Sequence, residues 1–88
     1  MFFIKIIFYT YLLRSKIKKW TYIGPTKNLC RRFKEHNSGK VKSTSPYLPF
    51  DLIYYEAYNN YTLARKREIE LKKKGQQKEI LMARLNIV

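Results

Sequence analysis

The stretch IKIIFYTYLLRSKIKKWTYIG, residues 4–24, decides the fold of this chain. Its first part, from about Ile4 to Arg14, is dominated by Phe, Ile, Tyr and Thr, which favour strands. Ser15 to Lys19 is a polar turn, and Trp20 to Gly24 is a second, shorter strand. The stretch therefore predicts a β-hairpin whose first strand is buried on both faces.

The hairpin leads into a helix and then a third strand. Pro25-Thr26 opens the helix, with Thr26 as its N-cap, and the helix continues to about Asn37, with Gly39 just past its end. A loop rich in Ser, Lys and Pro follows. Phe50 to Ala57 is apolar on both faces, which predicts the central strand of the sheet.

The C-terminal part of the chain is helical. Asn59-Asn60 turns the chain into a helix from about Thr62 to Lys74, which Gly75 ends, and Gln76 to Leu85 makes a last helix within residues 76–86. The order β-β-α-β-α-α predicts one α+β domain over residues 1–88, with its core in residues 8–75. In it, a small three-stranded antiparallel sheet is flanked by helices.

Composition narrows the class of protein. The 88 residues suffice for one small domain, and 19 Lys and Arg against 6 Asp and Glu give a formal net charge of +13. Hydrophobic residues make up 45% of the chain, too many for a disordered polyelectrolyte. Cys30 is the only cysteine and His36 the only histidine, which excludes a disulfide scaffold and nearly excludes a four-ligand zinc site.

The charge of +13 indicates the kind of partner, because it attracts polyanions, of which nucleic acid is the commonest. Binding to a membrane surface would need the cations on one face of one helix, whereas here they extend from Arg14 to Arg84. The apolar N-terminal run is interrupted by Lys5 and lacks the features of a signal peptide. We therefore expect a cytoplasmic protein that binds nucleic acid and no membrane.

The first helix has an apolar stripe with two arginines placed differently around it. At about 100° per residue, Leu29, Phe33 and His36 share the buried stripe. Arg32 lies on its shoulder and Arg31 faces solvent. Arg32 could be an edge residue with a solvated head group, and His36 a hydrogen-bonded core histidine, or both could belong to a site.

The next helix places a carboxylate beside apolar residues. Glu68 lies at the edge of a stripe that contains Leu63, Ala64 and Leu71, where a charge is costly unless it is paired. Either Glu68 forms a structural ion pair with Lys72 or Arg67, or it is a ligand for a hard divalent cation. Glu56, in the third strand, is the second candidate carboxylate.

Tyrosines are frequent in the hairpin. Tyr9 and Tyr11 lie on the same face of their strand, and pairing could bring Tyr11 beside Tyr22. Packing alone could explain them, since tyrosine favours strands. Gly24, between a strand and a helix, makes a compact backbone site where anions can bind.

Together these segments resemble the GIY-YIG nuclease domain over roughly Tyr9 to Lys72. The segments that carry the resemblance are Tyr9-Thr10-Tyr11, Tyr22-Ile23-Gly24, Thr26-Lys27-Asn28-Leu29, Arg32, His36-Asn37-Ser38-Gly39-Lys40 and Ala64-Arg65-Lys66-Arg67-Glu68-Ile69-Glu70-Leu71-Lys72. Tyr9-Thr10-Tyr11 stands where the family has Gly-Ile-Tyr, and keeps the last tyrosine. Pro25 stands where excision-repair members have a lysine, so no lysine role is carried over.

The resemblance implies a fold and an activity. The family fold is a three-stranded antiparallel sheet flanked by helices, and the chain looks most like the short, stand-alone bacterial members. Members are endonucleases, including the nicking domain of bacterial excision repair. The implied activity is hydrolysis of phosphodiester bonds in DNA with Mg²⁺ or another divalent cation such as Mn²⁺, in DNA repair or related processing.

The resemblance also implies roles for five residues. Tyr11 or Tyr22 would deprotonate or orient the attacking water, and Arg32 would lower the pKa of that tyrosine and stabilise the phosphorane. His36 would orient a tyrosine or phosphate or carry a proton, and Glu68 would hold the metal ion. The residues expected to contact nucleic acid are Gly24, Thr26, Lys27, Arg31, Lys40 and Lys42.

Two other functions compete with the nuclease. The chain could be a basic nucleic-acid-binding module that keeps the fold but cleaves little, since it has no second recognition domain. A structural adaptor would leave the positions of Arg32, His36 and Glu68 unexplained. The choice of DNA or RNA, branched or linear substrate, a targeting protein partner and the oligomeric state stay open.

Overall fold

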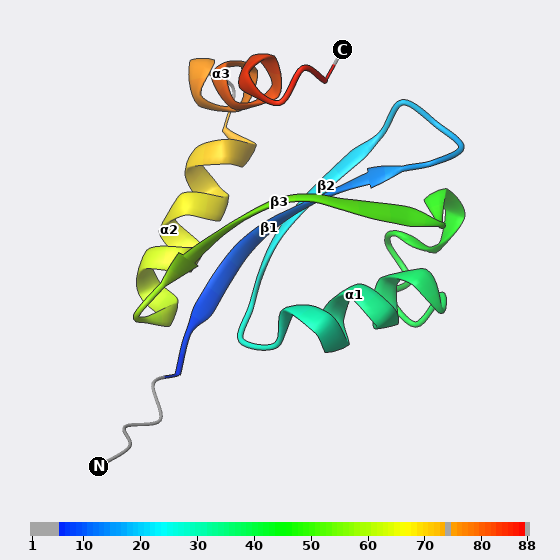
Figure 1. Ribbon diagram of the computed structural model, residues 1–88, viewed down its shortest axis with the longest axis horizontal. Helices are drawn as coiled ribbons and strands as arrows, with labels where there is room; N and C mark the ends of the chain where they lie inside the picture. The colour runs from blue at the N-terminus through cyan, green and yellow to red at the C-terminus, as the bar shows by residue number, and fades with distance from the viewer. Residues whose placement is uncertain (1–5, 74, 88) are drawn as a thin grey trace.

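The computed structural model describes residues 6–73 and 75–87, and its elements follow the expected order β-β-α-β-α-α (Figure 1). The three strands form one antiparallel sheet, so the predicted α+β class is confirmed. The elements are β1 (Phe8–Ser15), β2 (Thr21–Thr26), α1 (Leu29–Asn37), the short 3₁₀ helix η1 (Ser45–Tyr47), β3 (Phe50–Tyr58), α2 (Tyr61–Lys72) and α3 (Gln76–Arg84).

The strand order is β2-β1-β3, so the prediction that the third strand is central is wrong. β1 holds the centre, and its residues from Thr10 to Leu13 are all buried. In β3 the side chains of Asp51, Tyr55 and Ala57 are exposed. Several of the residues counted as apolar in β3 are tyrosines, whose hydroxyl group tolerates an exposed edge position. Counting them as apolar led to the prediction of a fully buried strand.

β1 begins at Phe8 rather than at Ile4, because its partner ends there. Phe8 pairs with Tyr58, the last residue of β3, and the chain then turns into α2. Ile6 is 64% exposed and precedes the strand. Ile4 and Lys5 lie outside the described residues.

The boundary between β2 and α1 also differs from the prediction. Pro25 and Thr26 continue β2, where they pair with Thr10 and Tyr9 of β1. The edge position of β2 accommodates a proline, which has no N–H to donate. The N-cap of α1 is Asn28 rather than Thr26, and its side chain accepts a hydrogen bond from the Arg31 N–H at 3.0 Å.

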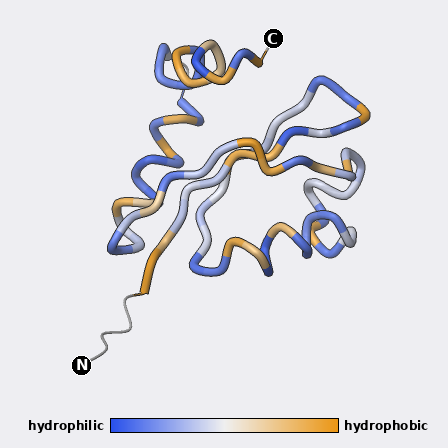
Figure 2. Tube along the Cα trace, viewed as in Figure 1, coloured by the Kyte–Doolittle hydropathy of each residue, from blue (hydrophilic) through white to orange (hydrophobic). Residues whose placement is uncertain are grey.

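One face of the sheet is covered by α1. Tyr11 and Phe50 of the strands form a core against which Leu29 and Phe33 of α1 pack, and His36 is fully buried there. The predicted buried stripe of the first helix is thus confirmed. In Figure 2 hydrophobic and hydrophilic colours alternate along α1, as they do in an amphipathic helix.

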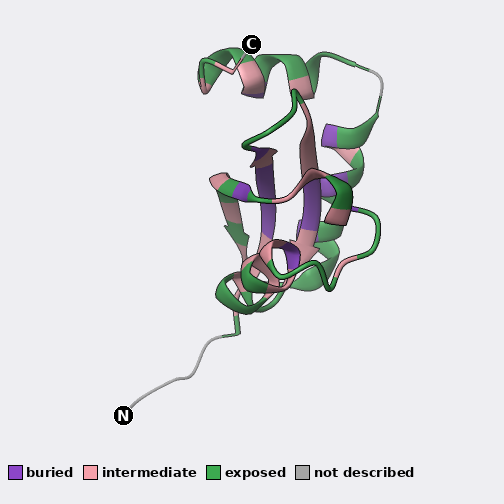
Figure 3. Ribbon diagram, turned by 90° about the vertical axis from the view of Figure 1, so that its right-hand side faces the viewer, coloured by how far each residue is buried: buried purple, intermediate pink, exposed green. Residues whose placement is uncertain are grey.

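The opposite face is covered by the two C-terminal helices. Leu12 and Ile23 of the strands pack with Leu71 of α2 and Leu81 of α3. Figure 3 shows the buried residues along the strands and on the helix sides that face them. Two-sided coverage therefore accounts for the continuous burial of β1.

The helix ends lie close to the predicted ones. α2 begins at Tyr61, with Asn60 as an N-cap that accepts from the Leu63 N–H at 2.9 Å. Its C-cap is Lys73, and Gly75 is the N-cap residue of α3 rather than the end of α2. Residue 74, the predicted last residue of that helix, lies outside the described residues.

The loop after α1 is tied to the hairpin. Gly39 has φ of 80°, a left-handed conformation that suits the expected end of the helix. The hydroxyl of Ser15 donates to the Tyr47 carbonyl at 2.6 Å, and the Lys16 N–H donates to the Pro49 carbonyl at 2.9 Å. These contacts fix the loop beside His36, where it supplies part of the site.

Candidate functional site

Tyr11 and His36 form a buried hydrogen-bonded chain with Thr44. The Tyr11 hydroxyl lies 2.8 Å from His36 Nε2, and His36 Nδ1 lies 2.8 Å from Thr44 Oγ1. The Thr44 hydroxyl donates to the Val41 carbonyl at 3.3 Å. Since Thr44 donates to this carbonyl, we assign the tautomer in which Thr44 accepts from Nδ1–H and neutral His36 accepts the Tyr11 proton at Nε2. In this arrangement the Tyr11 hydroxyl donates its hydrogen bond to His36.

The environment keeps His36 neutral. Burial lowers the pKa of His36 from 6.5 to about 4, and the nearby Arg32 charge adds to that effect, while Glu35 opposes it. At neutral pH the imidazole is consequently an acceptor for Tyr11 rather than a cation.

We expect this buried histidine to make folding sensitive to acid. The folded-state pKa lies below the unfolded value, so protonation favours the unfolded chain, and stability present above pH 6.5 falls as the pH drops toward 4. The shift corresponds to about 3 kcal/mol. Urea unfolding between about pH 4 and pH 7 measures it. His36→Gln should flatten the profile relative to the parent, and parallel profiles would contradict the prediction.

Burial also governs the pKa of Tyr11, but in the direction opposite to the one expected. Burial raises the pKa of the Tyr11 phenol, with Tyr22 and Glu68 adding smaller increments, and Arg32 only partly offsets this. The predicted effect of Arg32 on Tyr11 is therefore present, because Arg32 lowers this pKa, but burial outweighs it and the net shift is upward. Tyr11 stays protonated at neutral pH, and it can take up a proton only as it gives its own to His36.

Tyr22 lies beside the same pair. Its ring centroid is 6.1 Å from that of Tyr11 and 5.0 Å from that of His36. In the sheet register Tyr11 is opposite Gly24, and Tyr22 is opposite Leu13, so the two tyrosines are diagonal neighbours on the α1 face. The expected approach of Tyr11 and Tyr22 is therefore present.

Gly24 makes room for both rings. A Cβ atom at this position would lie 2.9 Å from the Tyr11 hydroxyl oxygen and 2.9 Å from Cε2 of Tyr22. Gly24 is buried inside β2, not at the start of α1, so the premise of an anion site at the helix N-terminus does not hold. Close approach of side chains is the reason for a glycine here.

Gly24→Ala should therefore disturb the positions of the Tyr11 and Tyr22 side chains. The added methyl group must displace Tyr11 or Tyr22, and we expect a loss of about 1–3 kcal/mol in the free energy of unfolding. Urea denaturation measures this loss, and histidine NMR resonances report the contact between Tyr11 and His36. Gly75→Ala is the control, because nothing lies within 4 Å of its new Cβ. Equal effects of the two substitutions would refute the steric account.

Arg32 and Arg31 are placed as the helix phase predicts. Arg32 is half-buried, with its Nη1 3.2 Å from Glu35 Oε1, and its charge acts on both Tyr11 and His36. Arg31 is exposed. Arg32 therefore combines proximity to the buried chain with access from solvent.

Glu68 lies deeper than predicted. It is only 4% exposed, whereas Leu63 is 42% exposed, so the face of α2 that meets the sheet runs through Ala64, Glu68 and Leu71. The predicted stripe contained Leu63 together with Ala64 and Leu71, and its inclusion of Leu63 is wrong. The buried side of α2 is the one that packs against β2 and β1.

Two cations hold the Glu68 carboxylate. Oε2 accepts from Lys72 Nζ at 2.6 Å, which matches one of the two expected pairs, and Oε1 accepts from Arg65, which was not an expected partner. Lys72 Nζ also lies 5.3 Å from the centroid of the Tyr22 ring. Although α2 covers the face opposite to the two tyrosines, Lys72 thereby connects the Glu68 carboxylate to the ring of Tyr22, which belongs to the edge strand β2.

The other expected partner, Arg67, belongs elsewhere. Its Nε donates to Glu56 Oε1 at 2.9 Å, and Glu56 also accepts from the hydroxyls of Tyr54 at 2.7 Å and Tyr58. Glu56 is opposite Thr10 in the register, on the α2 face of the sheet. The second candidate carboxylate is thus part of a separate ion-pair network.

The remaining expected nucleic-acid contacts lie around α1. Lys27 and Arg31 are exposed near its first turn, and Lys40 and Lys42 are exposed beyond its last. Thr26 is half-buried, and its hydroxyl accepts from the Asn28 N–H at 3.1 Å. The cations of this set are free to meet a solvent-borne polyanion.

The candidate metal ligand is a single carboxylate, that of Glu68. Within residues 6–73 and 75–87, no cluster of three or more His, Cys, Asp or Glu side chains is present. A single carboxylate suits a hard cation such as Mg²⁺, which keeps several waters and takes substrate phosphates as further ligands.

Within residues 6–73 and 75–87, no helix is long and apolar enough to span a bilayer.

Comparison with known proteins adds the following. A family model described as the GIY-YIG catalytic domain matches residues 7–80. A UPF0213 protein of Syntrophus aciditrophicus is 32% identical over 80 residues, covering 89% of this chain and 91% of the relative. A UPF0213 protein of Clostridium perfringens is 39% identical over 66 residues, covering 74% and 70%.

A solved structure is also similar. The solution NMR structure of a UPF0213 protein from Bacillus halodurans is 32% identical, with a TM-score of 0.54, and the match covers 90% of this chain and 84% of that one. Sequence and backbone thus agree on the same group of relatives.

Proposed function

This chain belongs to the GIY-YIG family, a nuclease family, and on that premise we propose that it is a metal-dependent endonuclease that hydrolyses phosphodiester bonds in DNA. The observation that carries the proposal is the Glu68 carboxylate, 4% exposed and joined through Lys72 to the tyrosine pair. A carboxylate buried this deeply in a chain of net charge +13, and paired with a lysine that lies over the Tyr22 ring, is typical of a catalytic site.

We assign the proton transfer to Tyr11 and His36. The attacking water loses its proton to the Tyr11 oxygen while Tyr11 gives its hydroxyl proton to His36 Nε2. Thr44 holds Nδ1–H throughout, so the imidazole keeps its orientation. This coupled transfer avoids a free phenolate, which the raised pKa of Tyr11 disfavours, and because the pKa of His36 is lowered, the imidazolium readily gives the proton up again. Tyr22 would position the water or the phosphate from the other side of the pair.

Charge stabilisation falls to Arg32. Its guanidinium is accessible from solvent and lies next to Tyr11, and its planar donors suit the developing charge on a phosphorane. Glu35 holds one Nη1 at 3.2 Å and restricts the side chain before substrate arrives.

Glu68 would hold the divalent cation. Its present partners, Arg65 and Lys72, have side chains 51% and 46% exposed, so both can move away into solvent. When bound, the cation would supply Lewis-acid stabilisation of the leaving oxygen. A cytoplasmic location fits the exposed free thiol of Cys30.

The test of the proposal is a nicking assay on labelled duplex, flapped and single-stranded substrates with and without Mg²⁺. We expect Mg²⁺-dependent cleavage of at least one substrate. In metal-free anisotropy measurements we also expect binding to DNA that weakens steeply as salt rises, because neutralised phosphates release counterions. A flat salt response would overturn the electrostatic part of the proposal.

The second candidate function is a nucleic-acid-binding module with little cleavage. Both oxygens of Glu68 are already paired with cations, which would suit a purely structural carboxylate. A parent protein that binds DNA but never cuts any substrate, with Mg²⁺ or Mn²⁺, would favour this alternative.

A further inference from the structure

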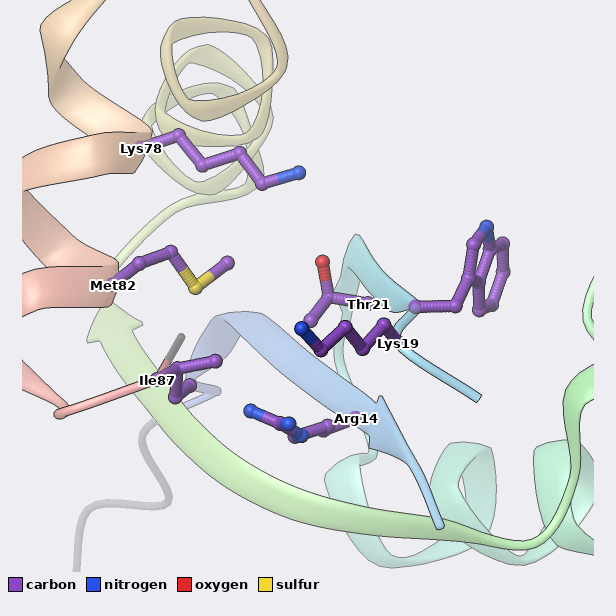
Figure 4. A pocket seen from close by; sticks show the side chains of 7 residues that line it. Arg14, Lys19, Thr21, Lys78, Met82 and Ile87 are labelled. Atoms are coloured by element: carbon purple, nitrogen blue, oxygen red, sulfur yellow. The ribbon is translucent and has the colours of Figure 1, made fainter. Parts of the chain in front are cut away.

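A small hollow lies between the hairpin and α3, away from the residues discussed so far (Figure 4). Its volume is about 260 Å³, close to the lower end of the range for small-ligand pockets. The residues that line it are Arg14, Lys19, Trp20, Thr21, Lys78, Met82 and Ile87.

Three cations from three segments meet there. Arg14 comes from β1, Lys19 from the hairpin turn and Lys78 from α3, and Figure 4 shows their side chains directed toward the hollow. Among the described residues, none of the three forms a salt bridge. Asp51, which is opposite Arg14 in the register, pairs instead with Lys16 at 3.4 Å. The hollow thus holds concentrated positive charge without a protein anion.

The hollow also has an apolar wall. Met82 and Ile87 present a thioether and an alkyl group, and the Thr21 hydroxyl adds a polar atom beside them (Figure 4). The Trp20 ring is engaged elsewhere, stacked on Tyr47 with centroids 3.9 Å apart. An inorganic anion would use only the cations, whereas a ligand with a flat apolar part and a phosphate would use both.

The hollow is on the other side of the sheet from the tyrosine pair. Arg14 and Thr21 are opposite each other in the β1–β2 register, on the same face as Leu12, which packs with α3. Tyr11 points to the α1 face. A ligand here therefore lies on the opposite face of the sheet from Tyr11 and His36.

We propose that this hollow binds one unpaired nucleotide of the substrate, with its base against Met82 and Ile87 and its phosphate among Arg14, Lys19 and Lys78. The inference rests on the proposed function and narrows its substrate to nucleic acid with a single-stranded segment. A second hollow of about 450 Å³ shares Arg14 and Lys19 and continues over the hairpin turn, past Lys18 and the ion pair of Lys16 with Asp51. The phosphates next to the bound nucleotide follow this basic surface.

The direct test uses the parent protein without metal and a deoxynucleoside monophosphate as the probe. Two-dimensional NMR should show shifts of the Met82 methyl and of the Thr21 and Ile87 amides during titration. Inorganic phosphate should leave the Met82 methyl unmoved. The proposal is overturned if phosphate produces the same shifts as the nucleotide, or if the nucleotide perturbs only residues around Tyr11.

A charge-matched pair of variants supplies the second test. Lys78→Gln removes a cation from the hollow, and Lys66→Gln removes an exposed one from α2. Lys78→Gln should weaken binding of a duplex with a single-stranded overhang about 3–10-fold, lower the salt slope by about 0.7, and scarcely change binding of a blunt duplex. Lys66→Gln should affect both ligands slightly and equally. Equal losses for both ligands with Lys78→Gln would overturn the proposal.

Both binding tests are carried out in the presence of EDTA, so metal-dependent cleavage does not contribute to the signals. A protein that binds overhangs through the hollow but never nicks DNA would defeat the nuclease proposal and keep this one. If the protein nicks blunt and overhanging duplexes alike, and Lys78→Gln is as active as the parent on both, the nuclease proposal is kept and the proposal for the hollow is overturned.

Discussion

Glu68→Gln is expected to abolish Mg²⁺-dependent nicking while metal-free binding to DNA stays unchanged or becomes slightly tighter. The substitution keeps the shape of the side chain and removes the charge of the buried carboxylate that Lys72 connects to Tyr22. We expect a loss of at least about 10³-fold in cleavage rate, the scale of removing a principal source of transition-state charge stabilisation. Binding tightens because a negative charge near the phosphates has gone. Single-turnover nicking and anisotropy without metal measure the two effects.

The rival explanation, that Glu68 serves only an ion pair, is tested through its partners. Lys72→Met and Arg65→Met each remove one cation and leave the carboxylate in place. If Glu68 holds the metal ion, each variant should still nick, with an equal or lower Mg²⁺ requirement, because a competing cation is gone. If either variant is as inactive as Glu68→Gln while remaining folded by circular dichroism, or if Glu68→Gln nicks like the parent, the metal assignment fails.

Local chemistry made most of the fold predictable. Turn residues, caps and periodicity define each helix and strand to within a few residues, and the phase of α1 correctly separates Arg32 from Arg31. The errors come from tertiary context. β3 resembles a central strand by composition, yet β1 takes the centre because it is covered by helices on both faces.

The candidate site was predictable only in part, because much of it depends on contacts distant in sequence. Thr44 lies in a polar loop without any motif, and only the fold brings it to His36. Arg65 lies three residues before Glu68, a spacing at which side chains meet on a helix, whereas Arg67 is its direct neighbour in sequence, so helical spacing could have identified Arg65 as the partner. The pKa of Tyr11 depends on burial, which the presence of Arg32 in the sequence does not reveal.

The two neighbouring arginines of α1 allow the sharpest test of the catalytic geometry. Arg32→Ala should reduce the cleavage rate on the order of 10²–10³-fold, because the guanidinium beside Tyr11 is the group placed to stabilise the phosphorane. It should also weaken binding modestly, since a phosphate-facing cation is lost. The structural cost is small, because the ion pair of Arg32 with Glu35 is partly exposed. Single-turnover rates at saturating protein separate the loss of rate from the loss of binding.

Arg31→Ala is the matched control, since it removes the same charge from the adjacent position, where the side chain is exposed. Its cleavage rate at saturation should be near that of the parent, and its salt slope for binding should fall by about 0.9, the effect of one lost phosphate contact on duplex DNA. The two variants carry equal net charge, so any generic loss of attraction to DNA affects both. A larger loss of cleavage rate in Arg31→Ala than in Arg32→Ala would show that the reacting phosphate does not lie beside Tyr11, and the one-site mechanism would have to be abandoned.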